Sequence, residues 1–345
     1  MRGSVPRFLV IALAVSAAAC SSAPPAKSDA EYRRDVTTGM SQAIGGELKL
    51  MRAAVQAIAD AAPLPRASGW DEQADAGAIA SMKSSWTMAR SMYEHLEGAL
   101  EPLFPDLDAS IDARYETALA RGNDAYLFDD QGFVGLDAIE RVLYAPTTPA
   151  AVVDFEKKLA GYVPAALPTN AQEALDFKTK LCARLVADID ALLRRWQATA
   201  IDIDMVYGGL TSLVAEQRGE LDDAAAGAEE SRYSQRAMAN LRDNLEGVES
   251  IYGLFRDWLA SKPEGSDVDA RIEAAIADVR AAYDAVTGDD LPSAPADWNA
   301  ASPSSQDLTT VFGRLFTAVS GAGDAQRDGG LLHEMQRARQ LLALE

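Results

Sequence analysis

The stretch that decides the fold is DAGAIASMKSSWTMARSMYEHLEGALE, residues 75–101. It contains no proline, and its apolar residues recur every three or four positions, which is typical of an amphipathic helix. The rest of the chain after the N-terminal leader is similar. It is rich in alanine and lacks the alternation of Val, Ile, Thr and aromatic residues that is typical of strands. The sequence therefore predicts an all-α fold.

Proline and glycine gather between the periodic stretches and mark the expected helix ends. We expect helices at about 30–61, 75–101, 109–121, 133–144, 149–160, 169–200, 203–225, 233–260, 266–287, 304–320 and 328–344. Long helices joined by short loops favour antiparallel bundles. Prolines at 164 and 168 divide the chain into similar halves. We therefore predict two antiparallel helical bundles, at about 30–165 and 166–345, within one region that spans 30–345.

The composition excludes several classes of protein. The 345 residues include 32 Lys and Arg against 52 Asp and Glu, a formal net charge of −20, which argues against nucleic-acid binding. There is no phosphate-binding loop of the form G-x-x-x-x-G-K-[ST]. His95 and His333 are the two histidines, too few for a zinc finger or an HExxH zinc helix. The two cysteines, Cys20 and Cys182, exclude a disulfide framework.

The N-terminus predicts the compartment. Arg2 and Arg7 precede the apolar stretch FLVIALAVSAAA, residues 8–19, which is shorter than the ~20 residues that span a bilayer. Residues 1–19 therefore read as a signal peptide. Cys20 follows three alanines and resembles the acylated cysteine of a bacterial lipobox, although Ala17 stands where leucine is preferred. We expect lipidation of Cys20 and a polar tether over 20–29. The alternative is an ordinary signal peptide that is cleaved near Cys20.

The position of Ser22 bears on the membrane to which a lipoprotein is sorted. Its place two residues after Cys20 resembles the sorting signal for the outer membrane of a Gram-negative bacterium. The sequence thus predicts a lipid-anchored protein that faces the periplasm.

The helix at 75–101 carries a mixed stripe. Trp86, Arg90, Tyr93 and Glu97 are spaced by 4, 3 and 4 residues and so share one face. His95 falls on the opposite face, so it cannot easily share a ligand with Glu97. The stripe is either part of a site or an interfacial helix with an internal Arg–Glu pair.

A second pattern lies in GLDAIERVLY, residues 135–144. Asp137 and Glu140 are one turn apart and share a face with Tyr144. Two such carboxylates bind a hard cation if another helix supplies further oxygens. The alternative is a solvated acidic face beside Arg141.

Two further segments complete the set of candidates. In PDLDASIDAR, residues 105–114, Asp108 is expected to cap a helix, whereas Asp112 is one turn in and is less easily explained as a cap. In residues 229–247, EESRYS is followed by Asn244 and Gly247, and Ser234 is a plausible helix cap.

These four segments, in this order, resemble the imelysin-like family, which includes the EfeO- and EfeM-type periplasmic iron-uptake lipoproteins and the imelysin peptidases. The resemblance covers residues 30–260 well and the remainder more loosely. The positions that carry it are Trp86, Arg90, Tyr93, Glu94 and Glu97; Asp106, Leu107, Asp108, Ile111, Asp112 and Arg114; Gly135, Glu140, Leu143 and Tyr144; and Glu229, Glu230, Tyr233, Ser234, Asn244 and Gly247. The family's hallmark is Gly-x-His-x-x-Glu, and here Asp137 stands where the family has histidine.

The resemblance implies an all-helical fold with a metal site made by the hallmark and by acids of the first bundle. An aspartate in place of histidine shifts the preference toward hard cations such as Fe(III), Ca²⁺ or Mn²⁺. The resemblance to iron-uptake lipoproteins makes iron one candidate, and the identity of the metal stays open among these hard cations. The predicted ligands are Glu97, Asp112, Asp137 and Glu140, with Arg90, Tyr93 and Tyr144 around them.

Three functions follow from these patterns. The first is a lipoprotein that captures a metal cation for iron uptake, with a permease or a peroxidase-type protein as partner. The second is an imelysin-type metallopeptidase, in which Asp137 and Glu140 would assist a metal-activated water. The third is an interaction lipoprotein that has lost the site. Convergence of the four predicted ligands favours the first two, and their dispersal favours the third.

Overall fold

The computed structural model describes residues 27–122 and 126–344. Helices and turns make up this part of the chain and no strand occurs in it, so the all-α prediction is confirmed. The predicted signal peptide, Cys20 and the tether as far as residue 26 lie outside the described residues.

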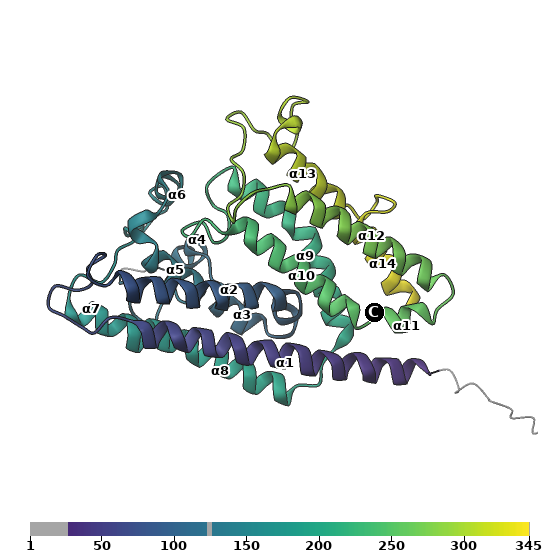
Figure 1. The fold of residues 1–345 in the computed structure, drawn as a ribbon, viewed down its shortest axis with the longest axis horizontal. Helices are drawn as coiled ribbons and strands as arrows, with labels where there is room; N and C mark the ends of the chain where they lie inside the picture. The colour runs from purple at the N-terminus through teal and green to yellow at the C-terminus, as the bar shows by residue number, and fades with distance from the viewer. Residues whose placement is uncertain (1–26, 123–125, 345) are drawn as a thin grey trace, which may run out of the picture.

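Fourteen α-helices occur in these two ranges, and Figure 1 shows their arrangement. Their bounds are α1 Asp29–Ala61, α2 Ala76–Leu103, α3 Pro105–Ile111, α4 Tyr115–Arg121, α5 Leu136–Leu143, α6 Ala150–Glu156, α7 Ala171–Asp176, α8 Ala183–Ala198, α9 Ile203–Ala224, α10 Ala237–Gly253, α11 Arg256–Ala260, α12 Gly265–Asp284, α13 Val311–Ala322 and α14 Leu331–Leu341. Short 3-10 turns cover Ala145–Thr147 and Asp307–Thr309, and a π-helical turn covers Phe177–Cys182.

The long helices begin and end close to the predicted residues, but three expected helices are interrupted. The helix expected at 109–121 is wrong as a single element, because the chain leaves α3 at Asp112 and re-enters a helix at Tyr115. The helix expected at 169–200 contains the π-helical turn between α7 and α8. The helix expected at 233–260 begins only at Ala237 and divides into α10 and α11.

Helix α2 is the central element of the packing. It packs against α1 on one side and against α9 and α10 on the other, while α12, α13 and α14 lie beyond α9. Helix α8 packs along α1 and α3, although it follows residue 166, where the boundary between two bundles is expected. That boundary stays a prediction.

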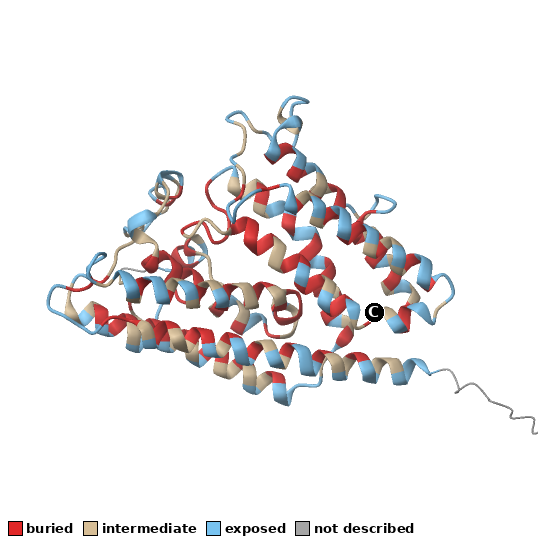
Figure 2. Cartoon of the chain, in the orientation of Figure 1, coloured by how far each residue is buried: buried red, intermediate tan, exposed pale blue. Residues whose placement is uncertain are grey.

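Each long helix turns one face to the interior, as Figure 2 shows. On α1 the buried side chains recur every three or four residues, which is the periodicity of an amphipathic helix. They are Val36, Met40, Ile44, Leu48, Met51, Ala54, Val55, Ile58 and Ala59.

Two glycines let the backbones of neighbouring helices touch α2. A Cβ added to Gly209 of α9 would lie 2.0 Å from the carbonyl oxygen of Gly98, and one added to Gly247 of α10 would lie 2.3 Å from that of His95. No side chain fits at such distances, so these positions require glycine. The close approach brings the side chains of α9 and α10 against α2.

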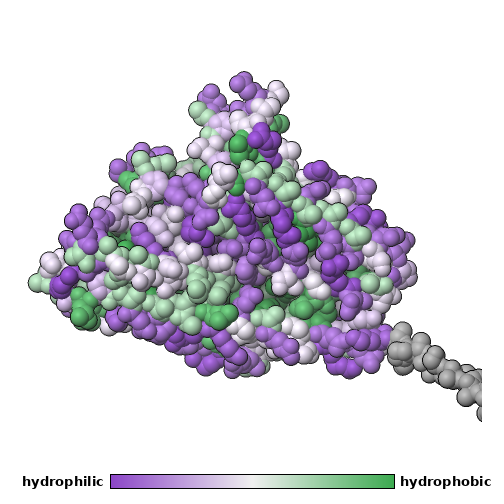
Figure 3. All heavy atoms as spheres, viewed as in Figure 1, coloured by the Kyte–Doolittle hydropathy of each residue, from purple (hydrophilic) through white to green (hydrophobic). Residues whose placement is uncertain are grey.

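The face of the molecule in Figure 3 mixes many hydrophilic residues with smaller hydrophobic patches. Across residues 27–122 and 126–344, none of the helices has the length and apolar character needed to cross a membrane.

Candidate functional site

A buried arginine on α2 organises the centre of the molecule. Arg90 is 0% exposed and forms ion pairs with Glu94 on the next turn, with Asp112 after α3, and with Glu230 in the loop before α10. The Oδ1 atom of Asp137 lies 3.5 Å from its Nη1 atom. One guanidinium thus faces four carboxylates. If all four are ionised the group carries excess negative charge, which protons or another cation must offset.

Local backbone geometry brings Asp137 to this group. Gly135 precedes α5 with φ of 96°, and a Cβ there would lie 2.3 Å from the carbonyl oxygen of Ile111. The start of α5 is thereby held against the end of α3. The indole Nε1 of Trp86 donates a hydrogen bond of 2.9 Å to the carbonyl oxygen of Leu136 and ties α5 to α2.

The Gly135→Ala variant is expected to be less stable than the wild type. Placing a non-glycine residue in this strained backbone region costs about 1–3 kcal/mol. The clash with Ile111 adds to this cost. The matched control is Gly46→Ala, because nothing lies within 4 Å of an added Cβ at that exposed helical position. Control and wild type should differ by no more than about 1 kcal/mol, with the control the more stable. Urea unfolding measures both, and equal stability of the two variants would contradict the role given to Gly135.

Beside the arginine lies a cavity of about 220 Å³ with acidic walls. We call it the acidic cavity. Carboxylates from α2, from α9, from α3 and the residue that follows it (the α3 segment, residues 105–112), and from the loop before α10 line it, together with the guanidinium of Arg114. They are Glu97, Glu101, Asp108, Asp112, Glu216, Glu220 and Glu230. Hard cations prefer such oxygen ligands.

Several buried oxygens at this centre have no hydrogen-bond donor. They include Oε2 of Glu94, Glu97 and Glu140, and Oδ1 of Asn244. Glu97 and Asn244 both line the acidic cavity. Buried acceptors without a partner are rare in folded proteins, and a bound cation satisfies them.

Burial raises the pKa of most of these carboxyl groups. It raises the pKa of Asp137 and of Glu140 to about 7, and that of Asp108 to about 6. The pKa values of Glu97 and Asp112 are also raised by burial, and nearby carboxylates add to the effect. At neutral pH the group therefore retains protons, which a metal ion would displace.

The pKa of Glu230 is shifted in the opposite direction. Burial raises its pKa, but the guanidinium groups of Arg90 and Arg114 and a hydrogen bond with Asp112 together lower it to about 2. Glu230 is therefore ionised at neutral pH and provides a fixed negative charge on the wall of the acidic cavity.

Two of the four predicted ligands, Asp112 and Asp137, lie at Arg90, and no three of the four, all of which lie in the described part of the chain, hold ligand atoms within 4.8 Å of one another. Glu97 and Asp112 line the acidic cavity. Asp137 lies at Arg90, and Glu140 accepts a hydrogen bond of 2.7 Å from the N–H of Ser234. Their role as metal ligands stays a prediction. Within the described residues, the groups of three whose ligand atoms lie within 4.8 Å of one another are His95 with Asp243 and Glu246, and His333 with Asp328 and Glu334.

The other predicted site residues also lie around this centre. The hydroxyl of Tyr93 donates a hydrogen bond to Asp108, and the ring of Tyr144 packs edge-on against Trp86 with 5.7 Å between centroids. Asp108 lies inside α3, so the expectation that it caps a helix is wrong. Ser234 lies before the start of α10 and does not cap it.

Several residues of the centre are absent from the predicted set of ligands and their neighbours. Glu94, Arg114 and Glu230 all stand at positions that carry the family resemblance, and this was the signal that could have found them. Glu220, which pairs with Arg114, has no such signal. Its role follows from the packing of α9 against α2.

The sequence model of the imelysin family matches residues 46–315. A search of curated proteins gives no match. The matched range runs from within α1 into α13 and includes Arg90 and every carboxylate of the acidic cavity. Because the match spans well over half of the chain, the protein belongs to the imelysin family.

Proposed function

We propose that the protein binds a hard metal cation in the acidic cavity. The observation that carries the proposal is the set of seven carboxylates around about 220 Å³, with unpartnered buried oxygens of Glu97 and Asn244 on its wall. Arg114 also lines the cavity, but it is already paired with Glu220 and Asp223. The carboxyl groups of the wall therefore leave an excess of negative charge for a cation once they release their protons.

The residues present fit a metal that prefers oxygen. The cavity offers carboxylate and amide oxygens, and neither histidine is among its lining residues. Such a donor set suits Fe(III), Ca²⁺ or Mn²⁺ better than a metal that favours imidazole. Glu97 and Asp112 supply ligands from the wall, while Asp137 lies beside Arg90 and Glu140 accepts a hydrogen bond from the N–H of Ser234, both outside the cavity lining.

Titration of the metal-stripped protein with Fe(III), Ca²⁺, Mn²⁺ and Zn²⁺ tests the proposal. We expect binding of at least one hard cation with release of protons, because carboxyl groups with raised pKa values must lose theirs. Calorimetry in buffers of different ionisation enthalpy counts the released protons. Binding without proton release would show that the ion occupies a different site.

We also propose that the protein is a periplasm-facing lipoprotein anchored at Cys20, on the outer membrane of a Gram-negative bacterium. The sequence of the leader and the position of Ser22 support this placement. Cation capture at this location suits iron uptake, with delivery to a permease or to a peroxidase-type partner, as the resemblance to the EfeO- and EfeM-type proteins suggests.

The Cys20→Ser variant should move from the membrane fraction to the soluble periplasmic fraction, because it lacks the thiol that accepts the lipid. Cell fractionation followed by immunoblotting measures the shift. The matched control is Cys182→Ala, which changes the buried cysteine of the helical body and should stay with the membrane. A wild-type protein found in the soluble fraction would contradict the anchor.

A further inference from the structure

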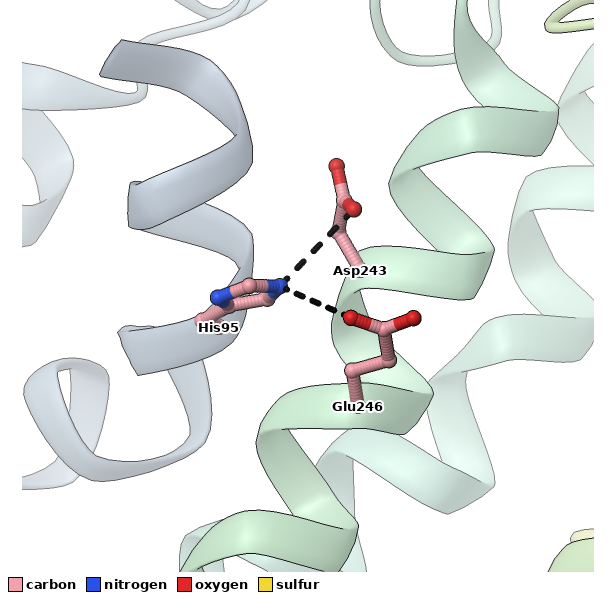
Figure 4. A group of neighbouring side chains, drawn as sticks. All are labelled: His95, Asp243 and Glu246. Carbon is pink, nitrogen blue, oxygen red and sulfur yellow. Dashed lines mark ion pairs between the residues drawn. The ribbon is translucent and has the colours of Figure 1, made fainter. Parts of the chain in front are cut away.

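A second cluster lies on the other face of α2, away from Arg90. Figure 4 shows Asp243 and Glu246 of α10 facing the ring of His95. The Nε2 atom of His95 lies 3.8 Å from Oδ1 of Asp243 and 3.6 Å from Oε2 of Glu246. The two acids are three residues apart and share one face of α10.

These separations suit a shared metal ion better than direct hydrogen bonds. They exceed the usual 2.7–3.2 Å of an N–H···O bond, and Nε2 of His95 is buried without a hydrogen-bond partner. Zinc binds histidine nitrogen and carboxylate oxygen at about 2.0–2.2 Å in a tetrahedron, so neighbouring ligand atoms lie about 3.4 Å apart. Small side-chain movements bring the three atoms to that geometry.

The surroundings of the cluster orient its members. Oε2 of Glu47, on α1, lies 3.8 Å from the other ring nitrogen, Nδ1 of His95. A carboxylate on the far nitrogen is the usual partner of a metal-binding histidine. The hydroxyl of Ser91 is hydrogen-bonded to Asp243. Gly247 allows α10 to touch the carbonyl of His95, so the acids of α10 stand next to the imidazole.

The cluster is also open to an incoming ion. A cavity of about 220 Å³ adjoins it and is lined by Glu47, His95 and Glu246 among others. The side chain of Glu246 is 62% exposed. A fourth ligand, such as water, has room on that side.

We propose that His95, Asp243 and Glu246 bind a divalent transition-metal ion of the zinc type, with Glu47 as the positioning residue on Nδ1. The ion would cross-link α2 to α10. This site lies on the other face of α2 from the acidic cavity, shares no residue with it, and does not depend on the function proposed above.

The other histidine cluster is less suited to a metal. The side chain of Asp328 is 94% exposed, and Glu334 is paired with Arg271 and Arg337. His333 therefore provides a matched control for His95.

The experiment is titration of the purified protein, prepared without a histidine tag, with Co²⁺ and Zn²⁺. Tetrahedral Co²⁺ gives strong visible absorption, and we expect one such ion per chain that Zn²⁺ displaces. His95→Asn and Asp243→Asn should abolish the spectrum, whereas His333→Asn should retain it. Glu47→Gln should weaken binding by about 10–100-fold, as expected for a residue that orients a ligand.

Circular dichroism confirms that each variant is folded. The proposal is overturned if the wild type gives no tetrahedral Co²⁺ spectrum, or if His95→Asn keeps it. A spectrum that Glu97→Gln abolishes would also overturn it, because the ion would then lie in the acidic cavity. Since Glu97 and His95 belong to different sites, the two proposals fail independently.

Discussion

Replacing Arg90 by methionine is expected to destabilise the protein by about 3–5 kcal/mol, because the variant leaves buried carboxylates without their shared guanidinium. Glu94, Asp112 and Glu230 form ion pairs with Arg90, and Asp137 lies 3.5 Å away. Urea unfolding at neutral pH measures the loss. The loss should shrink in acid, where protonation removes the charge of the carboxylates.

The control for this variant is an arginine at the surface. Arg195 pairs with Asp106 at 2.7 Å, but the two side chains are 42% and 68% exposed. Arg195→Met should therefore change the free energy of unfolding by only about 0–1 kcal/mol. An Arg90→Met variant that is no less stable than Arg195→Met would show that the buried network does not hold α2, the α3 segment and the loop before α10 together.

The metal-free protein is expected to lose stability as the pH rises from about 4.5 to about 7.5, by an amount on the order of a few kcal/mol. In the fold, burial raises the pKa of Asp137 from 3.8 and that of Glu140 from 4.5, each to about 7. The folded state therefore binds protons more tightly than the unfolded state. This contribution is complete below the unfolded pKa values and is lost as the pH passes the folded ones.

The contribution of Glu230 to the stability of the fold has the opposite pH dependence, in a lower pH range. Its pKa is lowered from 4.5 to about 2, so its contribution is present above the unfolded value and is lost as the pH falls toward 2. Unfolding in urea and a chelator, across a pH series, measures both effects.

The Asp137→Asn variant isolates the effect of Asp137, because its stability should fall less than that of the wild type between pH about 4.5 and 7.5. Parallel curves for the two proteins would contradict the raised pKa of Asp137.

The sequence predicts the long helices well because their periodicity is local information. The spacing of Trp86, Arg90, Tyr93 and Glu97 placed these residues on one face of α2, and the structure brings all four to the same interior region. The same spacing placed His95 on the opposite face, where it meets α10. Helical geometry alone is enough for both predictions.

The interruption of the helix at Asp112 could not be predicted in this way. Asp112 follows the last residue of α3 and pairs with Arg90, and Arg114 forms an ion pair with Glu220 of α9. Both contacts depend on segments that are distant in the sequence. Propensity and periodicity do not contain such information, and tertiary contacts override them.

The arrangement of the candidate site was only partly predictable. That Asp137 and Glu140 share a face follows from their spacing, but the position of Arg90 beside Asp137 depends on how α5 packs against α2. Glu230 pairs with the same arginine from a loop without regular structure. The direction of its side chain therefore cannot be predicted from a helical periodicity. The acidic cavity is likewise a product of packing among α2, α9 and α10.

The central claim is that the acidic cavity binds a hard cation, and a comparison of the wild type with Glu97→Gln tests it most directly. Thermal unfolding and calorimetric titration of the metal-stripped proteins with Ca²⁺, Mn²⁺ and Fe(III) are the measurement. At a free cation concentration about 100 times Kd, the wild type should gain about 2.7 kcal/mol. Glu97→Gln should lose most of this gain, because it removes an anionic oxygen from the wall and keeps the shape of the side chain. Glu249→Gln, at a surface ion pair with Arg280, should keep it. If no cation stabilises the wild type, or if Glu97→Gln responds like the wild type, the cavity is not a cation site and a protein-interaction role takes its place.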